Sequence, residues 1–456
     1  MKKIVVKFGG SNLRDKEGMK TIIRRVKEYN RPLVIVVSAF YGITNLLTEH
    51  LAVILSDGGK IKGLTESLSD MKKQIIEDLI QSTILQKEVF EKTTVRLNQL
   101  ERYLLGMHYI GDIPLFLEDL VLSYGERLSS LILTSVLQDN GVDCVEILPE
   151  EIGLYTDGEF GNATVDFNRS HDPVKANLAE DKIFIVPGFY GISAENKVTL
   201  LGRGGSDYSA ASIAKCINAE SLDIWKDVKG FLSADPKIVD HPIEIQRLDY
   251  TEAAELAYFG AKILHPRTIE PLMFDNIPIR IFNINEPEKG IKPHSIIDHE
   301  SDVSEKVIKS VTTSDDFGVL RLEGPGVGIK PGILAKVTGD FDREKINIKT
   351  VLTAQTSINF LLDKKDLLKA YNHARSLGLK AVNEIVLSDD VTLVAAVGKG
   401  LADNHGIAAC MFGALSEEKI NVNIICSGAS SVATYFIIKK ENKTRAVRAI
   451  HRAFFE

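Results

Sequence analysis

Three glycine-rich loops in this sequence carry polar or charged side chains beside segments with the pattern of strands and helices. They are "KFGG" at residues 7–10, "SAFYGITN" at 38–45 and "RGGSD" at 203–207. A helix N-terminus presents unpaired N–H groups and a partial positive charge, and glycine lets a ligand approach the backbone closely. Lys7 adds a compact cation, Arg203 adds a guanidinium, and Asp207 adds a carboxylate that can order them. These residue types predict a site that binds anions.

The loops can meet only if their flanking strands lie side by side in one sheet. Apolar, β-branched runs predict strands at residues 3–8, 32–38, 144–148, 183–186 and 221–225. Helical segments lie between them, and this alternation predicts an α/β fold, a three-layer αβα domain with a mostly parallel sheet, over residues 1–300. In open α/β sheets, ligands bind beyond the carboxyl ends of the strands, where these loops would lie.

Residues 60–105 have a different pattern, because Leu, Ile and Val recur at helical spacing among Lys, Glu and Gln. This spacing predicts a long helical hairpin. The hairpin either projects from the core as a lid or dimer contact, or packs on the sheet as an amphipathic pair. The sequence supports both alternatives equally.

The C-terminal part of the chain contains an internal repeat. The stretch "GILAKVTGDFDREKINIK", which starts at Gly332, aligns with "GIAACMFGALSEEKINVN", which starts at Gly406, 74 residues later. Such self-similarity predicts two copies of one supersecondary unit, here ferredoxin-like βαββαβ, at residues 314–389 and 390–456. The second copy lacks a last strand, and the strand-like segment 306–312 has no place in the first copy. We therefore expect residues 306–312 to complete the second copy, with the first copy inserted within it.

Composition and charge disfavour several classes of protein. The net charge of −7 disfavours partners such as nucleic acid or anionic lipid, and no apolar stretch approaches the roughly 18 residues of a membrane span. The four cysteines are scattered, which is typical of reduced thiols in a cytoplasmic protein and not of a metal site. The sequence has no P-loop motif, and no G-x-G-x-x-G follows the first expected strand. Any anion site must therefore come from the three loops.

Longer motifs around these loops resemble those of the aspartokinases, members of the amino-acid kinase family, over nearly the whole chain. The matching stretches are "VVKFGGSNL", "VVSAFYGITNLL", "SYGERLSS", "PGFYG", "TLLGRGGSDYSAA", "DIWKDVKGFLSADPKIV" and "ELAYFGAKILHPRTIEPL". The repeat is similar to the tandem ACT domains of that family, including "ICSGASS" at residues 425–431. The resemblance implies transfer of the ATP γ-phosphate to the β-carboxylate of L-aspartate, giving 4-phospho-L-aspartate, the first step toward lysine, threonine and methionine. With 456 residues, we expect the chain to carry no homoserine dehydrogenase portion.

For the catalytic residues, the resemblance implies charge neutralisation. Phosphoryl transfer needs positioning and electrostatic stabilisation more than a strong base, and the attacking group is already a carboxylate. Lys7, with the N–H groups of Gly9 and Gly10, is expected to offset charge on the transferred phosphate. Asp207 is expected to orient Lys7 or, alternatively, to cap the helix that starts beside it.

The resemblance also assigns residues to the amino-acid substrate. Arg203 would grip a carboxylate with its planar guanidinium, and Glu126 would hold the α-ammonium. The alternative for Glu126 is a glutamate at a helix start that complements the helix dipole. The other expected pocket residues are Ser38, Thr44, Phe189 and Ser206.

The nucleotide segment, residues 226–237, departs from the family pattern of a Thr-Asp pair, a tyrosine and an arginine. The candidate ATP contacts are Lys226, Asp227, Leu232, Lys237 and Lys262, together with Lys7, Gly9 and Gly10. The lysines of the segment would meet phosphate as point charges, and Leu232 would pack against the nucleoside. Mg²⁺ would be held mainly by the nucleotide phosphates, without a metal site made of protein ligands.

ACT pairs of this family bind amino acids between subunits, so the resemblance implies a homodimer or a dimer of dimers with lysine and/or threonine as effector. The candidate effector contacts are Ile329, Lys330, Gly332, Ile333, Leu334, Asn347 and Ile348. Lysine-sensing relatives carry an acidic residue where this chain has Lys349 in the first copy and Asn423 in the second. Threonine sensing, joint control and weakened control therefore stay open.

Two other functions stay open at the level of the sequence. Another amino-acid kinase, such as an acetylglutamate or glutamate kinase, would share the fold, although the combination of "GERLS", "RGGSD" and the ACT repeat disfavours it. A catalytically inactive amino-acid sensor would explain the changed nucleotide segment. The presence of Lys7, Glu126, Arg203 and Asp207 counts against that alternative.

Overall fold

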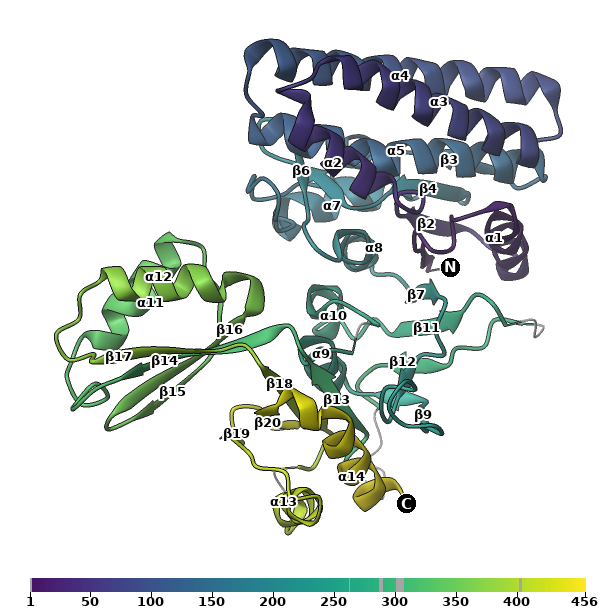
Figure 1. Ribbon diagram of the computed structural model, residues 1–456. Helices are drawn as coiled ribbons and strands as arrows, with labels where there is room; N and C mark the ends of the chain where they lie inside the picture. Colours follow the sequence, from purple (N-terminus) through teal and green to yellow (C-terminus); the bar gives the residue numbers. More distant parts are fainter. Residues whose placement is uncertain (1, 262, 287–289, 301–306, 402–403) are drawn as a thin grey trace. The chain divides into compact units, whose positions relative to one another are not determined.

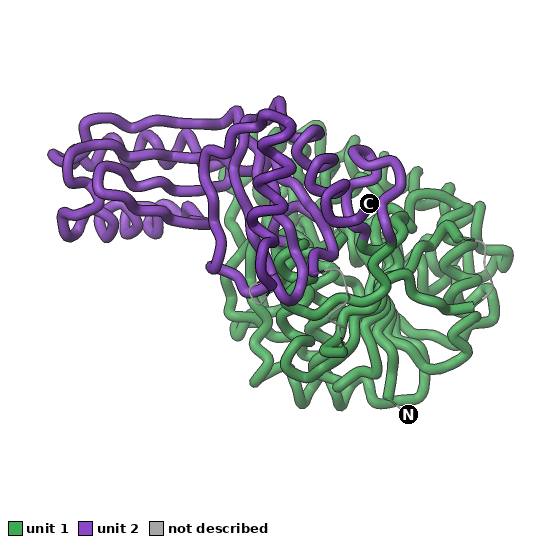
Figure 2. Tube along the Cα trace, turned by 90° about the horizontal axis from the view of Figure 1, so that it is seen from below, with its two compact units in different colours: residues 1–231, 244–257, 262–302 green, residues 232–243, 258–261, 303–456 purple. Residues whose placement is uncertain are grey.

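The computed structural model describes residues 2–261, 263–286, 290–300, 307–401 and 404–456 (Figure 1). These residues form two compact units, which Figure 2 distinguishes by colour. The first unit takes its residues from 1–231, 244–257 and 262–302, and the second from 232–243, 258–261 and 303–456. Each unit therefore contains segments that are distant in the sequence.

The first unit is built on an eight-stranded sheet with the order β10-β12-β11-β7-β1-β2-β4-β3. In that order, the strands are Arg247–Leu248, Ser295–Ile297, Ile279–Asn283, Ser221–Lys226, Ile4–Phe8, Leu33–Val37, Ile183–Pro187 and Cys144–Glu146. Neighbouring strands are parallel except for β11 and β12. The central strands β1 and β2 are buried along their whole length, as their apolar runs require in a sheet covered on both faces. The predicted, mostly parallel α/β sheet is confirmed.

Helices cover both faces of this sheet (Figure 1). α5 (Leu115–Asp139) packs on β2, β3 and β4, and α8 (Gly205–Cys216) packs on β1, β2 and β7 from the opposite face. α1 (Lys16–Tyr29) and α2 (Ile43–Ile54) share the hydrophobic core of α5, whereas α7 (Phe167–Asn177) and α10 (Pro266–Met273) pack against α8. The shorter elements are α6 (Pro149–Ile152), β5 (Tyr190–Ile192), β6 (Val198–Leu200), β8 (Phe231–Leu232), β9 (Glu244–Ile245) and α9 (Tyr250–Tyr258).

The predicted helical hairpin is formed by α3 (Gly59–Leu79) and α4 (Thr83–Ile110). Its buried side chains, among them Ile61, Leu68 and Leu100, belong to the same hydrophobic core as those of α5. The hairpin packs on α2 and α5, so it forms an outer helical layer instead of lying directly on the sheet (Figure 1).

α5 is the one helix in the described part of the chain that is long and apolar enough to cross a membrane. However, 89% of its most apolar window is buried inside the protein. Such burial is typical of the central helix of a folded core, because that helix is apolar on nearly every side.

In the second unit, each repeat forms a four-stranded antiparallel sheet. The first sheet has the order β15-β16-β14-β17, with strands Ile348–Ala354, Ser357–Asp363, Phe317–Glu323 and Glu384–Ser388. The second has the order β13-β18-β20-β19, with strands Ser310–Ser314, Val391–Val397, Ala433–Lys439 and Ile424–Cys426. Their helices are α11 (Ile333–Arg343) and α12 (Leu367–Ser376) in the first repeat, and α13 (Ile407–Glu417) and α14 (Lys443–Phe455) in the second. Short 3₁₀ turns at Lys364–Asp366 and Lys440–Asn442 precede α12 and α14.

The fourth strand of the second sheet comes from outside the second repeat. β13 pairs with β18 in the position that β17 occupies beside β14 in the first sheet. The strand expected at residues 306–312 is observed at Ser310–Ser314, and residue 306 lies outside the described residues. In the sequence, the first repeat thus lies between β13 and the rest of the second sheet.

Residues 232–243 and 258–261 pack with the second unit, although they lie within the first 300 residues. Ala234, Ile238 and Val239 are buried in the hydrophobic core formed by β13, β18, β20, α13 and α14. The chain segment expected to form one domain therefore contributes two short pieces to the second unit. These contacts are long-range, so no local pattern in the sequence indicates them.

Candidate active site

The three glycine-rich loops meet at a cavity of about 640 Å³ in the first unit. One wall is the loop after β1, another is the loop after β2, a third is a face of α5, and a fourth is the loop that leads into α8. The lining residues include Lys7, Gly10, Ser38, Thr44, Glu126, Phe189, Arg203, Ser206 and Asp207. The sheet thus brings residues from both ends of the first 210 positions to one cavity at the carboxyl ends of β1 and β2, the place that the topology of an open α/β sheet favours.

Lys7 and Asp207 form a buried ion pair in this cavity. Lys7 lies on β1, the strand between β2 and β7, and its Nζ is 2.6 Å from Oδ1 of Asp207. Asp207 lies in the first turn of α8, whose N-cap residue Gly204 makes no side-chain cap hydrogen bond. Of the two alternatives for Asp207, the structure shows the contact with Lys7 and not a helix cap.

A second lysine reaches the same carboxylate. Nζ of Lys226, at the end of β7, lies 3.3 Å from Oδ2 of Asp207. Burial alone would raise the pKa of Asp207, but the two ammonium groups outweigh this effect and lower the pKa to about 2. Burial lowers the pKa of Lys7, and the charge of Asp207 opposes that shift. Two lysines around one carboxylate leave a net positive charge, which favours the binding of an anion.

Glu126 lies in the middle of α5, with only 3% of its surface exposed, so it does not begin a helix. Its Oε1 accepts a hydrogen bond from Oγ of Ser206 at 3.4 Å, whereas its Oε2 makes no hydrogen bond of good geometry within the described residues. Burial raises the pKa of Glu126 to about 8, and the nearby N–H of Ala39 offsets this only in part. A buried carboxyl oxygen without a partner, in the wall of a cavity, is suited to a cationic group of a ligand.

Two close contacts hold α5 against the loop after β2. A Cβ atom added to Gly125 would lie 2.8 Å from Cβ of Ala39, so only glycine permits this approach. The N–H of Phe40 donates to Oγ of Ser129 at 2.9 Å. The residues of the motif "GERLS" therefore have a structural role, because its glycine and its serine, on either side of Glu126, contact the loop after β2.

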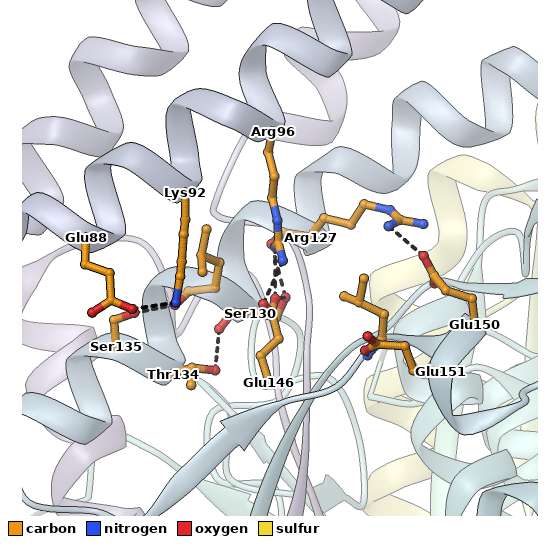
Figure 3. Close-up of polar contacts among 12 residues, drawn as sticks. Glu88, Lys92, Arg96, Arg127, Ser130, Thr134, Ser135, Glu146, Glu150 and Glu151 are labelled. Carbon is orange, nitrogen blue, oxygen red and sulfur yellow. Dashed lines mark hydrogen bonds and ion pairs between the residues drawn. The ribbon is translucent and has the colours of Figure 1, made fainter. Parts of the chain in front are cut away.

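A network of ion pairs ties α5 to α4, β3 and α6 (Figure 3). Arg96 of α4 donates two hydrogen bonds to the carboxylate of Glu146, at 2.9 and 2.7 Å, and Ser130 of α5 donates to the same carboxylate. Arg127 of α5 pairs with Glu150 of α6 at 2.8 Å. Two-pronged pairs of low exposure restrain both partners, so this network fixes the helix that forms the third wall of the cavity.

Phe189 has an unusual backbone conformation, with φ of 75°. Its N–H donates to Oγ of Ser209, and its carbonyl oxygen accepts from the N–H of Leu201, both at 2.8 Å. Left-handed backbone in a bulky residue persists only where its surroundings determine it, and such positions concentrate at binding sites. These hydrogen bonds hold the Phe189 ring in the cavity wall.

Arg203 is exposed at the cavity and forms no ion pair with another described residue. A guanidinium in this situation can bind a carboxylate without first losing a partner. All of the predicted substrate residues, namely Ser38, Thr44, Glu126, Phe189, Arg203 and Ser206, line the one cavity.

The two glycines after β1 differ in their surroundings. Gly10 lines the cavity, and a Cβ atom there would lie 2.9 Å from the carbonyl oxygen of Ala39. Gly9 does not line it, and its N–H already donates to Oδ1 of Asn12 at 3.0 Å. The "KFGG" pattern does not predict this turn, because Asn12, whose side chain accepts the hydrogen bond, lies outside the motif.

The expected nucleotide residues are not all gathered in this cavity. Lys226 reaches it through Asp207, whereas Asp227 is exposed and does not line it. Leu232 and Lys237 belong to the second unit, and Lys262 lies outside the described residues. Of the phosphate candidates, the structure brings together Lys7, Gly10 and Lys226.

Asp119 is a cavity residue that sequence reasoning missed. It lies on α5 and accepts hydrogen bonds from the N–H groups of Gly161, at 2.9 Å, and Leu200, at 2.8 Å. Burial raises its pKa. Asp119 lies about two helical turns before Glu126 and thus on the same face of the helix. This spacing is the feature of the sequence that could have identified Asp119 as a cavity residue.

The candidate effector residues lie in the first repeat, around the start of α11 and the start of β15. Ile329, Lys330, Gly332, Leu334 and Asn347 are exposed, Ile333 is buried, and Ile348 is half-buried. Lys349 lies at a bulge in the pairing of β15 with β16, 3.7 Å from Oδ1 of Asp363 and over the ring of Tyr258. Its ammonium therefore already has an acidic and an aromatic neighbour.

Comparison with known proteins decides the family. The model of the amino acid kinase family matches residues 2–283, and an ACT domain model matches residues 394–454. Aspartokinase 1, chloroplastic, of Arabidopsis thaliana is 30% identical over 469 residues, which cover 99% of this chain and 80% of that protein. The chain belongs to the aspartokinases of the amino acid kinase family. The predicted resemblance to the aspartokinases is thereby confirmed, and an acetylglutamate or glutamate kinase is disfavoured.

Other similar proteins support this assignment. Aspartokinase III of E. coli, solved in complex with aspartate and ADP in the R-state, superposes over the full length of both chains with a TM-score of 0.83 and 27% identity. Its T-state, in complex with lysine and aspartate, gives a TM-score of 0.80 and 26% identity. The bifunctional aspartokinase/homoserine dehydrogenase of Buchnera aphidicola is 30% identical over 99% of this chain but 56% of its own length. The chain thus spans about half the length of the bifunctional relatives that it matches.

Proposed function

We propose that this aspartokinase transfers the γ-phosphate of ATP to the β-carboxylate of L-aspartate. The observation that carries the proposal is the cavity in which the Lys7–Asp207–Lys226 cluster, the unpartnered carboxyl oxygen of Glu126 and the exposed guanidinium of Arg203 occur together. The relative in E. coli was solved with aspartate and ADP, which supports the same pair of ligands here.

The proposed roles of the substrate residues follow from their charges. Arg203 binds the α-carboxylate of aspartate with its planar guanidinium, and Glu126 binds the α-ammonium through Oε2. The side chains of Ser38, Thr44 and Ser206 supply hydroxyl groups in the same cavity, and Phe189 closes its wall. Because Arg203 and Glu126 bind the two α-substituents of aspartate, its β-carboxylate remains free to react.

Lys7 is the proposed catalytic residue, because its ammonium lies where the phosphate can be held. A β-carboxylate oxygen forms a bond to the γ-phosphorus while the bond from that phosphorus to the leaving oxygen of ADP breaks. Lys7 offsets the negative charge on the transferred group, and Asp207 holds the Lys7 ammonium in place, 2.6 Å away. No proton has to be removed, since the attacking group is ionised.

Mg²⁺ would enter this reaction with the nucleotide phosphates. Within the described residues, no cluster of three or more His, Cys, Asp or Glu side chains could hold a metal ion. The carboxylate of Asp207, beside Lys7, already contacts two ammonium groups.

The ACT repeats are proposed to bind an amino-acid effector around Ile329 to Leu334, Asn347 and Ile348, in a homodimer or dimer of dimers. The lysine complex of the E. coli relative supports an amino acid as the effector. Activity titrated with lysine, threonine and both together identifies the effector. Size-exclusion chromatography with light scattering identifies the oligomer.

An acceptor panel tests the proposed function. ADP release is measured with MgATP and L-aspartate, N-acetylglutamate or glutamate, and the product is trapped with hydroxylamine, which reacts with acyl phosphates. We expect aspartate-dependent ADP release with formation of the hydroxamate. If ADP is released only with another acceptor, the proposal is contradicted and another amino-acid kinase is favoured. If the protein binds nucleotide and amino acid without turnover, an inactive sensor is favoured instead.

A further inference from the structure

Residues 232–243, called here the anchored segment, include Leu232 and Lys237 of the nucleotide segment but are fixed by the second repeat. Oγ of Ser233 is hydrogen-bonded to Nε2 of His451 on α14 at 2.9 Å and accepts from the N–H of Ile243 at 2.8 Å. The carbonyl oxygen of Ser233 accepts from the N–H of Val311 on β13 at 2.8 Å. Ser233 is completely buried, so all of these contacts are made inside the unit.

The middle of the anchored segment is tied to the same helix. Nε of Arg448, one turn before His451 on α14, donates to the carbonyl oxygen of Ile238 at 2.7 Å. Ile238 and Val239 are buried in the core that α14 forms with the second sheet. The segment thus depends on α14 for a hydrogen bond at its start, a hydrogen bond in its middle and much of its apolar packing.

The polar residues of the segment point away from this core. Asp235 and Lys237 are exposed, and the backbone between them is a tight turn in which the carboxylate of Asp235 accepts from the N–H of Lys237 at 2.9 Å. The carbonyl oxygen of Asp235 accepts from the N–H of Ile238 at 2.8 Å. These two hydrogen bonds close the turn, which lies between Ser233 and Ile238, the residues that are hydrogen-bonded to α14.

We infer that α14 of the second ACT repeat positions the nucleotide segment, and that Arg448 and His451 are positioning residues for ATP. This inference rests on the proposed function and on the nucleotide contact that the resemblance to the aspartokinases implies for Lys237. Since α14 holds the segment in its binding conformation, a weaker hold lowers the fraction of molecules that can bind ATP and raises the apparent KM for ATP by the same factor. The aspartate cavity has no residue on α14 or in the anchored segment, so its KM should not change.

The first experiment compares Arg448→Ala with Arg445→Ala. Both arginines are exposed on α14, but Arg445 contacts Glu418 and not the anchored segment. Loss of the Arg448 hydrogen bond should raise the KM for ATP by at most about tenfold, the full value of one such bond, with the KM for aspartate and kcat at saturating ATP unchanged. Arg445→Ala should leave all three parameters unchanged.

The second experiment removes the contact at Ser233. His451→Phe keeps an aromatic ring against Phe455, on which the imidazole is stacked at 4.6 Å, but loses the hydrogen bond. His451→Gln retains a side-chain N–H near the position of Nε2. We expect a raised KM for ATP in His451→Phe and recovery in His451→Gln, which a change in general stability alone would not produce.

Hydrogen exchange of residues 232–243 tests the anchoring without any catalysis. Exchange should be faster in Arg448→Ala and His451→Phe than in the wild-type chain and in Arg445→Ala. Unchanged exchange, equal effects of Arg448→Ala and Arg445→Ala, or an equal rise in the KM values of both substrates would overturn the inference. If the wild-type chain shows no aspartate-dependent turnover, the proposed function fails, and equilibrium binding of MgATP to the same variants still decides whether α14 positions the segment.

Discussion

Lys7, Glu126 and Arg203 line a cavity whose described walls all belong to the first unit, whereas the nucleotide segment begins in the first unit and continues into the second. The cavity is fixed by contacts within the first unit, such as the Gly125–Ala39 contact and the Arg96–Glu146 pair. The nucleotide segment is fixed by a helix that lies at the far end of the sequence. The acceptor cavity is thus held within one unit, whereas residues 232–243 of the nucleotide segment are held by the second repeat.

The largest expected effect concerns Lys7, in the cavity of the first unit. Lys7→Ala should lower kcat by about a hundredfold or more, as the loss of one preorganised transition-state donor does. Lys20→Ala, which replaces an exposed lysine of α1, is the matched control. The measurement is ADP release at saturating aspartate and ATP, with thermal unfolding to show that the variant is folded. A loss of only a few-fold would remove Lys7 from its proposed role.

Glu126→Gln tests the ammonium site with almost no change in shape. Removal of a charged hydrogen-bond partner should raise the KM for aspartate by about ten- to a hundredfold, with little change in the KM for ATP. An equal rise in both values would show that Glu126 supports the fold of the whole cavity and does not contact one substrate.

The raised pKa of Glu126, about 8, predicts a pH dependence of both binding and stability. Aspartate needs the ionised carboxylate, so the KM for aspartate should rise as the pH falls below 8, by up to about tenfold per pH unit. This slope should be absent in Glu126→Gln.

The stability of the ligand-free protein should depend on pH in the direction opposite to that of aspartate binding. A carboxyl whose pKa is higher in the folded state than in the unfolded state destabilises the ligand-free protein increasingly as the pH rises through that folded-state value. Glu126→Gln should therefore melt at a higher temperature than the wild-type chain near pH 8, and the difference should shrink toward pH 4.5. A difference that does not change with pH would contradict the assignment of this pKa to Glu126.

The smallest expected effect concerns Lys226, at the position where the resemblance to the aspartokinases implies a threonine. Its side chain is 21% exposed and 3.3 Å from Asp207, while Lys7 makes the shorter contact. Lys226→Thr should therefore change the KM for ATP by no more than about fivefold, as expected for the loss of a partly exposed ion pair. A loss of turnover as large as that of Lys7→Ala would instead make the two lysines equivalent.

Much of this arrangement could be predicted from the sequence, because its signals are local. The repeat pattern predicts a first βαββαβ unit from residue 314, and the first strand of that unit is observed at Phe317–Glu323. The glycine-rich loops drew attention to Lys7, Arg203 and Asp207, and the structure brings all three to one cavity. The strand that closes the second sheet was also found, because a repeat that lacks one element must obtain it elsewhere.

The rest could not be predicted, because it depends on contacts between distant residues or on very short elements. The strands Arg247–Leu248 and Glu244–Ile245 have too few residues to show any periodicity. Nothing near Arg96 in the sequence indicates that it pairs with Glu146. Likewise, Ile238 has the pattern of an ordinary apolar residue, and its burial against α14 follows only from the folded chain.

The route of the chain between the units has a consequence for how the protein can be divided. A fragment cut at residue 300 would retain Ala234, Ile238 and Val239 but lose every strand and helix that covers them. It would expose an apolar strip and release the backbone that α14 now holds. We therefore expect deletion of the C-terminal half to lower the solubility of the remaining fragment, so the proposed feedback is better probed through point changes in the intact chain.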